Sequence, residues 1–121
     1  MAKLSLSGRD YPAADKFLGT RDARTIGNNT RLERRKDAIA VVLHSTDAVT
    51  LWANGDVELN SGGWRTVTTM SRIMEFIPPG YYVQQRKFVW FLVHRTTEVK
   101  DKFEDGVRIT RDGRVSLPAV S

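Results

Sequence analysis

Six consecutive apolar residues at positions 38–43 (AIAVVL) set the tightest limit on how this chain folds. A short run that is apolar on both sides is typical of a strand at the centre of a sheet, where both faces are covered. Lys36-Asp37 precedes the run and Ser45-Thr46-Asp47 follows it, and both are predicted to turn the chain. Residues 30–35 are predicted to form the preceding strand. The middle of the chain is therefore expected to be a β-sheet.

Two glycine turns define the register of further strands. At Ala53-Asn54-Gly55, a two-residue Asn-Gly turn would mix polar and apolar residues on one face. A three-residue loop with a left-handed Gly55 gives one apolar face between residues 48–52 and 57–60, and is favoured. Arg111-Asp112-Gly113 repeats the pattern. The predicted pairs are Leu51 with Val57, Val49 with Leu59, Ile109 with Val115, and Val107 with Leu117.

One clear amphipathic helix is predicted over residues 69–77, with Thr68 as its N-cap and the Pro-Pro-Gly at 78–80 as its end. Its apolar stripe, interpreted as the face packed on the sheet, consists of Met70, Ile73, Met74 and Ile77. Residues 11–19 have proline in the first turn and glycine at the end, which predicts a short helix of minor importance.

The last third of the chain is predicted to contain another hairpin, with strands at 81–85 and 88–94 around Arg86-Lys87. Alternation places Trp90 among the packed residues. The aromatic residues expected to be exposed are Tyr81, Tyr82 and Trp52. Residues 95–105 are charged and are predicted to form an exposed loop.

Together these patterns predict one α+β domain over residues 1–121. A mostly antiparallel sheet of about six to eight short strands would pack against the one main helix. Residues 1–11 are expected to be a loose leader, 12–117 the globular part, and 118–121 a frayed tail.

The composition narrows the function classes. The net charge is +5 and the pI about 9.9, with residues 1–37 at +4, 38–63 at −3, 64–102 at +4 and 103–121 neutral. A basic face attracts phosphate backbones, although ordinary solubilising charge would give the same count. The absence of cysteine excludes disulfides, thiolate zinc sites and a cysteine nucleophile, and fits a reducing compartment.

The nine residues 61–69 (SGGWRTVTT) join a predicted hairpin to the main helix and are the best candidate for a functional surface. Glycines before a helix N-terminus expose backbone N–H groups that can hold a phosphate. The predicted phosphate-holding residues are Gly62, Gly63, Thr68 and Thr69, with Arg65 adding charge. Alternatively, the glycines only let the chain turn, and Trp64 packs over the edge of the core.

The only two histidines, His44 and His94, fall near the ends of predicted strands. If they met, they could act as the acid–base pair of a small ribonuclease. The alternative is that each satisfies local hydrogen bonds. No other catalytic residue is predicted. No metal site and no cofactor are predicted either, since the chain has no paired histidines at ligand spacing and no carboxylate cluster.

Basic and aromatic residues interleave at 64–72 and 81–91, a combination that small modules use to hold phosphates and stack bases. The residues predicted to contact phosphates are Arg65, Arg72, Arg86 and Lys87, extended by Arg31, Arg34, Arg35 and Lys36. Stacking is assigned to Trp64 and Tyr82.

The chain resembles a family of small proteins encoded by bacteriophages and other mobile elements. The likeness rests on residues 32–35 (LERR), 39–41 (IAV), 43–47 (LHSTD), 59–69 (LNSGGWRTVTT) and 72–73 (RI). It covers about residues 16–113, and its most specific element is the core Ser-Gly-Gly-Trp-x-Thr-x-Thr-Thr. The resemblance implies an accessory protein that acts in a bacterial host, and it carries over no catalytic residues.

The leading hypothesis is a phage-type accessory protein that binds nucleic acid, DNA or RNA, through its basic and aromatic surface without catalysis. The alternative is a protein that binds and inhibits or modulates a host factor. A small ribonuclease is the third hypothesis. We expect a cytoplasmic protein in the host bacterium, without a membrane segment, since no apolar run reaches the roughly 18 residues that span a bilayer. Monomer and homodimer are left open.

Overall fold

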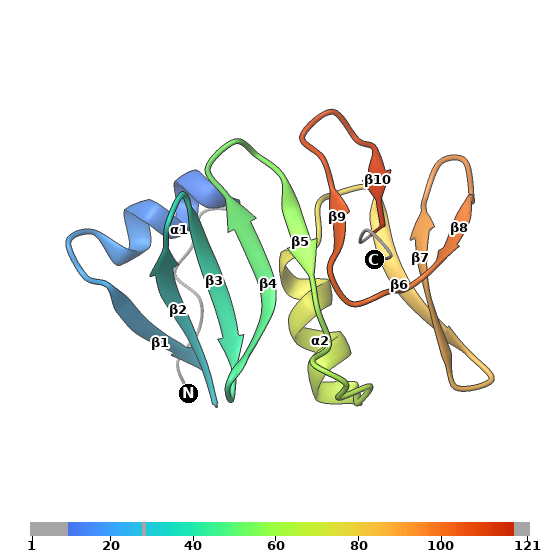
Figure 1. Cartoon of the computed structure of the whole chain (residues 1–121), viewed down its shortest axis with the longest axis horizontal. Coiled ribbons are helices and arrows are strands. Elements are labelled where there is room, and N and C mark those ends of the chain that lie inside the picture. Colours follow the sequence, from blue (N-terminus) through green and yellow to red (C-terminus); the bar gives the residue numbers. More distant parts are fainter. Residues whose placement is uncertain (1–9, 28, 118–121) are drawn as a thin grey trace.

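A computed structural model describes residues 10–27 and 29–117. Two antiparallel sheets lie side by side along the long axis of the molecule, with two helices (Figure 1). This arrangement confirms the predicted α+β class and its mostly antiparallel strands. The expected frayed tail and nearly all of the expected leader lie outside the described residues.

The helices are α1 (Tyr11–Leu18) and α2 (Val67–Phe76). The strands in chain order are β1 (Ala23–Gly27), β2 (Thr30–Arg35), β3 (Ala38–Leu43), β4 (Thr46–Trp52), β5 (Val57–Leu59), β6 (Tyr81–Arg86), β7 (Val89–His94), β8 (Lys100–Lys102), β9 (Val107–Ile109) and β10 (Val115–Ser116). The larger sheet has the order β1-β2-β3-β4-β5-β9-β10, and the smaller has the order β6-β7-β8.

The apolar run at 38–43 forms β3, which lies inside the larger sheet and is buried along its whole length, as predicted. Its residues alternate between two environments. Ile39 and Val41 join the main core, whereas Ala40 and Val42 are buried on the opposite face. On that opposite face, Arg31 of β2 and Asp47 of β4 lie on either side of Val42 in the ladder.

The predicted turn at Gly55 is confirmed. Leu51 pairs with Val57 and Val49 with Leu59, and Gly55 has a φ of 99°. The second glycine turn is confirmed only in part. Ile109 pairs with Val115, but Val107 pairs with Leu59 of β5 instead of with Leu117, because β10 ends at Ser116.

The strands at the start of the larger sheet differ from the prediction. The turn after β3 is made by His44 and Ser45, so β4 begins at Thr46, and a bulge between Val41 and Val42 absorbs the change of register. Strand β1 was not predicted; it pairs with β2 and forms an edge of the larger sheet.

Helix α2 begins earlier than predicted. Thr66, not Thr68, is the N-cap, and its hydroxyl accepts a hydrogen bond from the backbone N–H of Thr69 at 3.2 Å. The apolar stripe is confirmed, since Ile73 is fully buried and Met70, Met74 and Ile77 pack against the core. Helix α1 has the predicted Pro and Gly positions, and it also contributes the buried Ala14 and Leu18 to the core.

The charged segment 95–105, predicted as an exposed loop, instead contains strand β8 and returns to the core at Phe103, which is 1% exposed. The Phe103 ring packs edge-to-face on Trp90 at 5.5 Å. Its backbone N–H donates to the Trp90 carbonyl, and the N–H of Gly106 donates to the carbonyl of Leu59. This segment therefore passes from β8 of the smaller sheet to β9 of the larger one. The strands form two sheets, where one was predicted.

Candidate functional site

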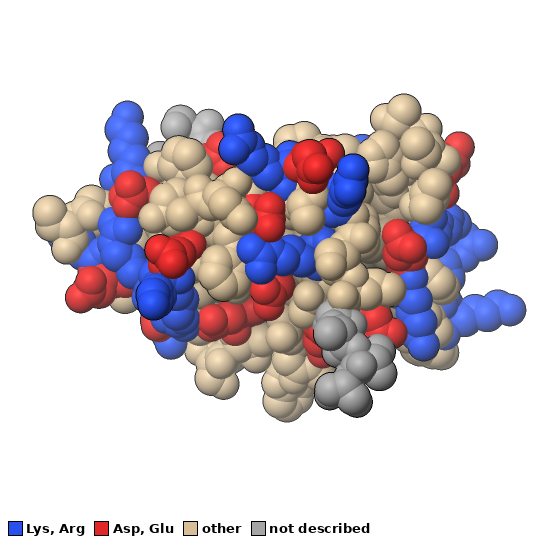
Figure 2. Space-filling view, turned by 45° about the horizontal axis from the view of Figure 1, so that its top comes forward, with Lys and Arg blue, Asp and Glu red and all other residues tan. Residues whose placement is uncertain are grey.

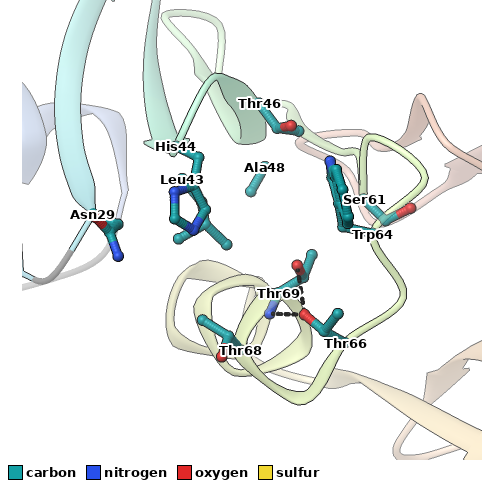
Figure 3. Close-up of a pocket in the computed structure, with 10 residues that line it drawn as sticks. All are labelled: Asn29, Leu43, His44, Thr46, Ala48, Ser61, Trp64, Thr66, Thr68 and Thr69. Carbon is teal, nitrogen blue, oxygen red and sulfur yellow. Dashed lines mark hydrogen bonds between the residues drawn. The ribbon is translucent and has the colours of Figure 1, made fainter.

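A pocket of about 290 Å³ lies where the β3–β4 turn, the loop at 61–66 and the first turn of α2 meet (Figure 3). We call it the Trp64 pocket. The residues that line it are Asn29, Leu43, His44, Thr46, Ala48, Ser61, Trp64, Thr66, Thr68 and Thr69. Three groups singled out in the sequence (His44, Trp64 and the threonines of the helix start) thus meet in one place. The sequence had given no reason to assign Asn29 to this site.

The loop at 61–66 is held by a buried hydroxyl and a close backbone contact. Ser61, 1% exposed, donates from its N–H and from its Oγ to one carboxylate oxygen of Asp105, at 2.8 and 2.7 Å. Gly62 has a φ of 62°, and a Cβ at this position would lie 2.5 Å from Thr46 Oγ1. Glycine is therefore required at 62 by both conformation and space.

Three of the four residues predicted to hold a phosphate, Gly62, Gly63 and Thr69, already donate their backbone N–H groups to acceptors within the protein. Gly62 donates to Asn60 Oδ1 at 2.6 Å, Gly63 to Ser61 Oγ at 3.2 Å, and Thr69 to Thr66 Oγ1 at 3.2 Å. A phosphate would have to displace these bonds. The glycines instead fit the alternative interpretation, in which they let the chain turn tightly.

Arg65 and Arg72, both predicted to contact phosphates, are engaged inside the fold. Arg65 Nε donates to Ser61 Oγ at 2.8 Å, and its guanidinium lies about 5 Å from the ring centres of Trp90 and Phe103. Arg72 Nε donates to Thr30 Oγ1, and its Nη1 pairs with Glu75, each at 2.8–2.9 Å. These contacts give both arginines a role in joining elements of the fold.

The arginines of β2 are paired with carboxylates. Arg31 and Arg35 both pair with Glu33, and Arg35 also pairs with Asp47 at 2.9 Å. Hydrogen bonds from Arg35, and then from Arg31, hold the pKa of the Glu33 carboxyl below its usual value. Arg34 pairs with Asp15 at 2.7 Å and donates to the carbonyl of Gly19, which ties α1 to the sheet. The neighbouring Lys36 is exposed.

The outer face of the smaller sheet carries a different set of charges. Trp90 and Leu92 of β7 point into the core, so Phe91 and Val93 lie on the opposite face, where they pair with Lys102 and Lys100. Tyr82 and Arg86 of β6 share this face through their pairing with Val93 and Val89. We call it the three-stranded face, formed by Tyr82, Gln84, Arg86, Val89, Phe91, Val93, Lys100 and Lys102.

Cations on and beside the three-stranded face have no carboxylate partner among the described residues. These cations are Arg86, Lys87, Lys100 and Lys102, and all four are exposed. In Figure 2, blue and red side chains intermingle over the part of the molecule where Figure 1 draws β1–β5, and blue side chains project at the end where Figure 1 draws β7 and β8. The smaller sheet therefore carries a group of cations without carboxylate partners, although Lys16, Arg21, Lys36 and Arg111, elsewhere in the described chain, have none either.

The aromatic residues are exposed in a different pattern from the one predicted. Tyr81 is buried, and its hydroxyl donates to the carbonyl of Gly113 at 2.6 Å. Trp52 is half-buried, with the Arg108 guanidinium 4.5 Å from its ring centre. Tyr82 is half-buried beside Arg95 at 4.8 Å. The well-exposed rings are Trp64 at 66% and Phe88 at 92%; Phe88 lies in the β6–β7 turn, not in the strand predicted for it.

The two histidines lie in different surroundings. His44 lines the Trp64 pocket, whereas His94 packs edge-on against Tyr81 and accepts a hydrogen bond from the backbone N–H of Thr97 at 3.2 Å. A separate pocket adjoins His94, between the smaller sheet and the β9–β10 turn. The predicted acid–base pair is therefore not assembled, and His94 fits the alternative of local hydrogen bonding.

Sequence reasoning did not assign Phe88, Lys100 or Lys102 to a functional surface. The signal for β8 was weak, because three residues between charged turns give too short a pattern to recognise. In the sequence, the apolar Phe103 directly after Lys102 indicates that this segment returns to the core, where Phe103 is buried.

The fold and its surfaces define a small α+β protein made of two open antiparallel sheets on a shared core. The model of the Kyanoviridae Gp96 protein family matches residues 16–110, and the chain belongs to this family of phage proteins. No curated protein and no solved structure matches the chain.

Two features are absent from the described part of the chain. Across residues 10–27 and 29–117, no helix has the length and apolar character needed to cross a membrane. Within the same ranges, no group of three or more histidine, aspartate or glutamate side chains is arranged to hold a metal ion.

Proposed function

We propose that this phage protein binds single-stranded nucleic acid on the three-stranded face, without catalysis. The observation that carries the proposal is the group of exposed cations on and beside that face, Arg86, Lys87, Lys100 and Lys102, that have no carboxylate partners in the described chain. Exposed cations attract phosphates and release counterions, which is the main source of sequence-independent affinity.

Aromatic side chains beside these cations support a single strand over a duplex. Phe88, 92% exposed, lies between Lys87 and β7, and the half-buried rings of Tyr82 and Phe91 lie on the face itself. Unpaired bases stack on such rings, whereas the bases of a duplex are already stacked on each other. The open sheet also presents its side chains on a broad surface that an extended strand can cross.

The test is fluorescence anisotropy with labelled single-stranded and duplex DNA and RNA, between about 50 and 200 mM salt. We expect micromolar binding that prefers single strands and weakens steeply with salt. In K100A/K102A the affinity should fall roughly tenfold at low salt, and the salt slope should fall by about 0.7 for each phosphate that the variant no longer neutralises.

The matched control is R31A/R35A, which removes the same two positive charges from the larger sheet. Its affinity should stay within about threefold of wild type, because these arginines already neutralise Glu33 and Asp47. Equal reductions in affinity in the two variants would show that only net charge matters and would overturn the assignment of the face. No binding of any nucleic acid at low salt would overturn the function.

A host protein is the second candidate partner, because apolar side chains are exposed at the same end of the molecule. Phe88 is 92% exposed, and Val99, ahead of β8, is 56% exposed. Aromatic residues are frequent anchors of protein interfaces. A stoichiometric host complex that is insensitive to salt and does not form with F88A, together with no nucleic-acid binding, would favour this candidate.

A further inference from the structure

We propose that the Trp64 pocket binds one neutral planar heterocycle, a nucleobase, stacked on the indole of Trp64. The natural source of the base would be the single strand of the proposed function, and in that respect this inference rests on it. The chemistry of the pocket can be judged separately, from its charge, its walls and its size.

The lining of the pocket excludes an anion as its preferred ligand. None of the ten described residues that line it is Arg, Lys, Asp or Glu. The backbone N–H groups of Gly62, Gly63 and Thr69 already donate to acceptors within the protein. A phosphate placed here would lose its hydration without gaining a cation in return, which is unfavourable. A neutral ring loses far less on leaving water.

Two rings form opposite walls of the pocket. Figure 3 shows the Trp64 indole on one side and the His44 imidazole on the other, with Ala48 between them and the threonines of α2 below. The indole is 66% exposed, although it belongs to a loop that Ser61 and Asp105 hold in place. An exposed indole on an anchored loop offers a stacking surface for a base, and the cost of ordering the loop backbone has already been met by folding.

The position of His44 supports a role for its side chain. Its φ is 58°, in the left-handed region that glycine or asparagine usually occupies in turns. The strand-end turn is anchored by the N–H of His44, which donates to the Asn29 carbonyl at 2.8 Å, and by Arg31, which donates to the His44 carbonyl at 3.1 Å. A histidine kept in this conformation places an imidazole, which can donate or accept hydrogen bonds, at the mouth of the pocket.

The size and polarity of the pocket match one base. Its volume of about 290 Å³ lies at the lower end of the range for small-molecule sites, so it accepts a single ring system but not two stacked nucleotides. Thr46 and Thr68, each of which carries a hydroxyl group, are among the lining residues. A hydroxyl can donate or accept, so these groups can bond the mixed donor and acceptor edge of a base.

The test is an NMR titration of the ¹⁵N-labelled full chain with the four ribonucleosides and with adenosine 5′-monophosphate. We expect nucleosides to shift the indole N–H of Trp64 and the backbone N–H of Thr68. The monophosphate should bind no more than about threefold tighter than adenosine, because no cation lines the pocket. W64A should weaken nucleoside binding about tenfold or more, W64F should retain most of it, and F88A should leave it unchanged.

Three results would overturn one proposal and spare the other. If nucleosides at their solubility limit shift neither signal while labelled oligonucleotides bind, the base pocket is wrong and the three-stranded face stands. If nucleosides bind but no oligonucleotide does, the pocket stands with a free nucleoside as its ligand, and the proposed function is wrong. A monophosphate that binds more than about tenfold tighter than adenosine would make this an anion site and overturn the inference.

Discussion

The two sheets of this protein share one core but differ in whether their basic side chains are paired with carboxylates. On the outer face of the larger sheet, beside the buried β3, Arg31 and Arg35 form ion pairs with Glu33, and Arg35 also pairs with Asp47. On the smaller sheet, Lys100 and Lys102 extend from an edge strand that pairs only with β7. A count of positive residues along the chain does not distinguish these two situations.

The difference shows that ion pairing with carboxylates decides which basic side chains are free to bind an anion. Arginine forms planar, multiple hydrogen bonds with carboxylates and suits a structural role on the larger sheet. Lysine is a flexible point charge and suits loose contact with phosphates. The Trp64 pocket has no charged residue in its lining, and this is consistent with a neutral ligand.

The largest expected effect comes from separating the smaller sheet from the core. Phe103 is 1% exposed and packs on Trp90 and under Arg65. F103A should lower the free energy of unfolding by about 3–5 kcal/mol, because apolar burial is reduced and a cavity is left behind. The matched control is F88A, in a turn of the same sheet, which should change it by less than about 0.5 kcal/mol. Urea denaturation measures both; similar decreases would contradict the anchoring role of Phe103.

A second prediction concerns the loop that forms the Trp64 pocket. In G62A the left-handed backbone costs about 1–2 kcal/mol, and the new methyl group also meets Thr46, so stability should fall by more than about 2 kcal/mol in total. G63A carries the same backbone cost, with a φ of 83°, but nothing lies within 4 Å of the added carbon. Thermal unfolding of the two variants should therefore rank G62A as the less stable, and the reverse order would contradict the contact with Thr46.

The contrast between the sheets can be reduced by freeing the paired arginines. E33Q/D47N removes the carboxylates that neutralise Arg31 and Arg35 and gives the larger sheet unpaired cations. We expect affinity for single-stranded oligonucleotides to rise several-fold, about two- to tenfold, with a steeper salt slope. The comparison variant is D22N/D37N, which also removes two negative charges but from exposed carboxylates that pair with no cation among the described residues. A rise of the same size in D22N/D37N would mean that net charge, and not release of the arginines, is responsible.

The smallest expected effect is a dependence of stability on pH. The pKa of Glu33 is lowered in the folded protein, so its contribution to stability is present above its unfolded pKa near 4.5 and disappears as the pH falls through the lower folded value. E33Q should remove this part of the acid dependence, with a change below about 1 kcal/mol because the arginine partners are partly exposed. Urea midpoints between neutral pH and about pH 3 measure it; an unchanged pH profile in E33Q would contradict it.

Features that depend on neighbours along the chain could be predicted from the amino-acid sequence. The apolar run placed β3, the spacing around Gly55 gave the correct register of β4 and β5, and the stripe of Met70, Ile73, Met74 and Ile77 gave the packed face of α2. Each follows from a local rule, namely strand alternation, turn geometry or helical periodicity. The same local rules allowed Trp90 to be placed in the core.

Which charges stay unpaired and which side chains meet depends on how whole elements pack, and it could not be predicted from the sequence. The ion pair of Arg34 with Asp15, the bonds of Ser61 to Asp105 and the position of Phe103 on Trp90 join residues that are 19, 44 and 13 positions apart. His44 and Trp64 likewise come together because β4 and β5 return the chain to the end of β3. No pattern within a short window encodes such contacts, since they depend on how complete elements pack.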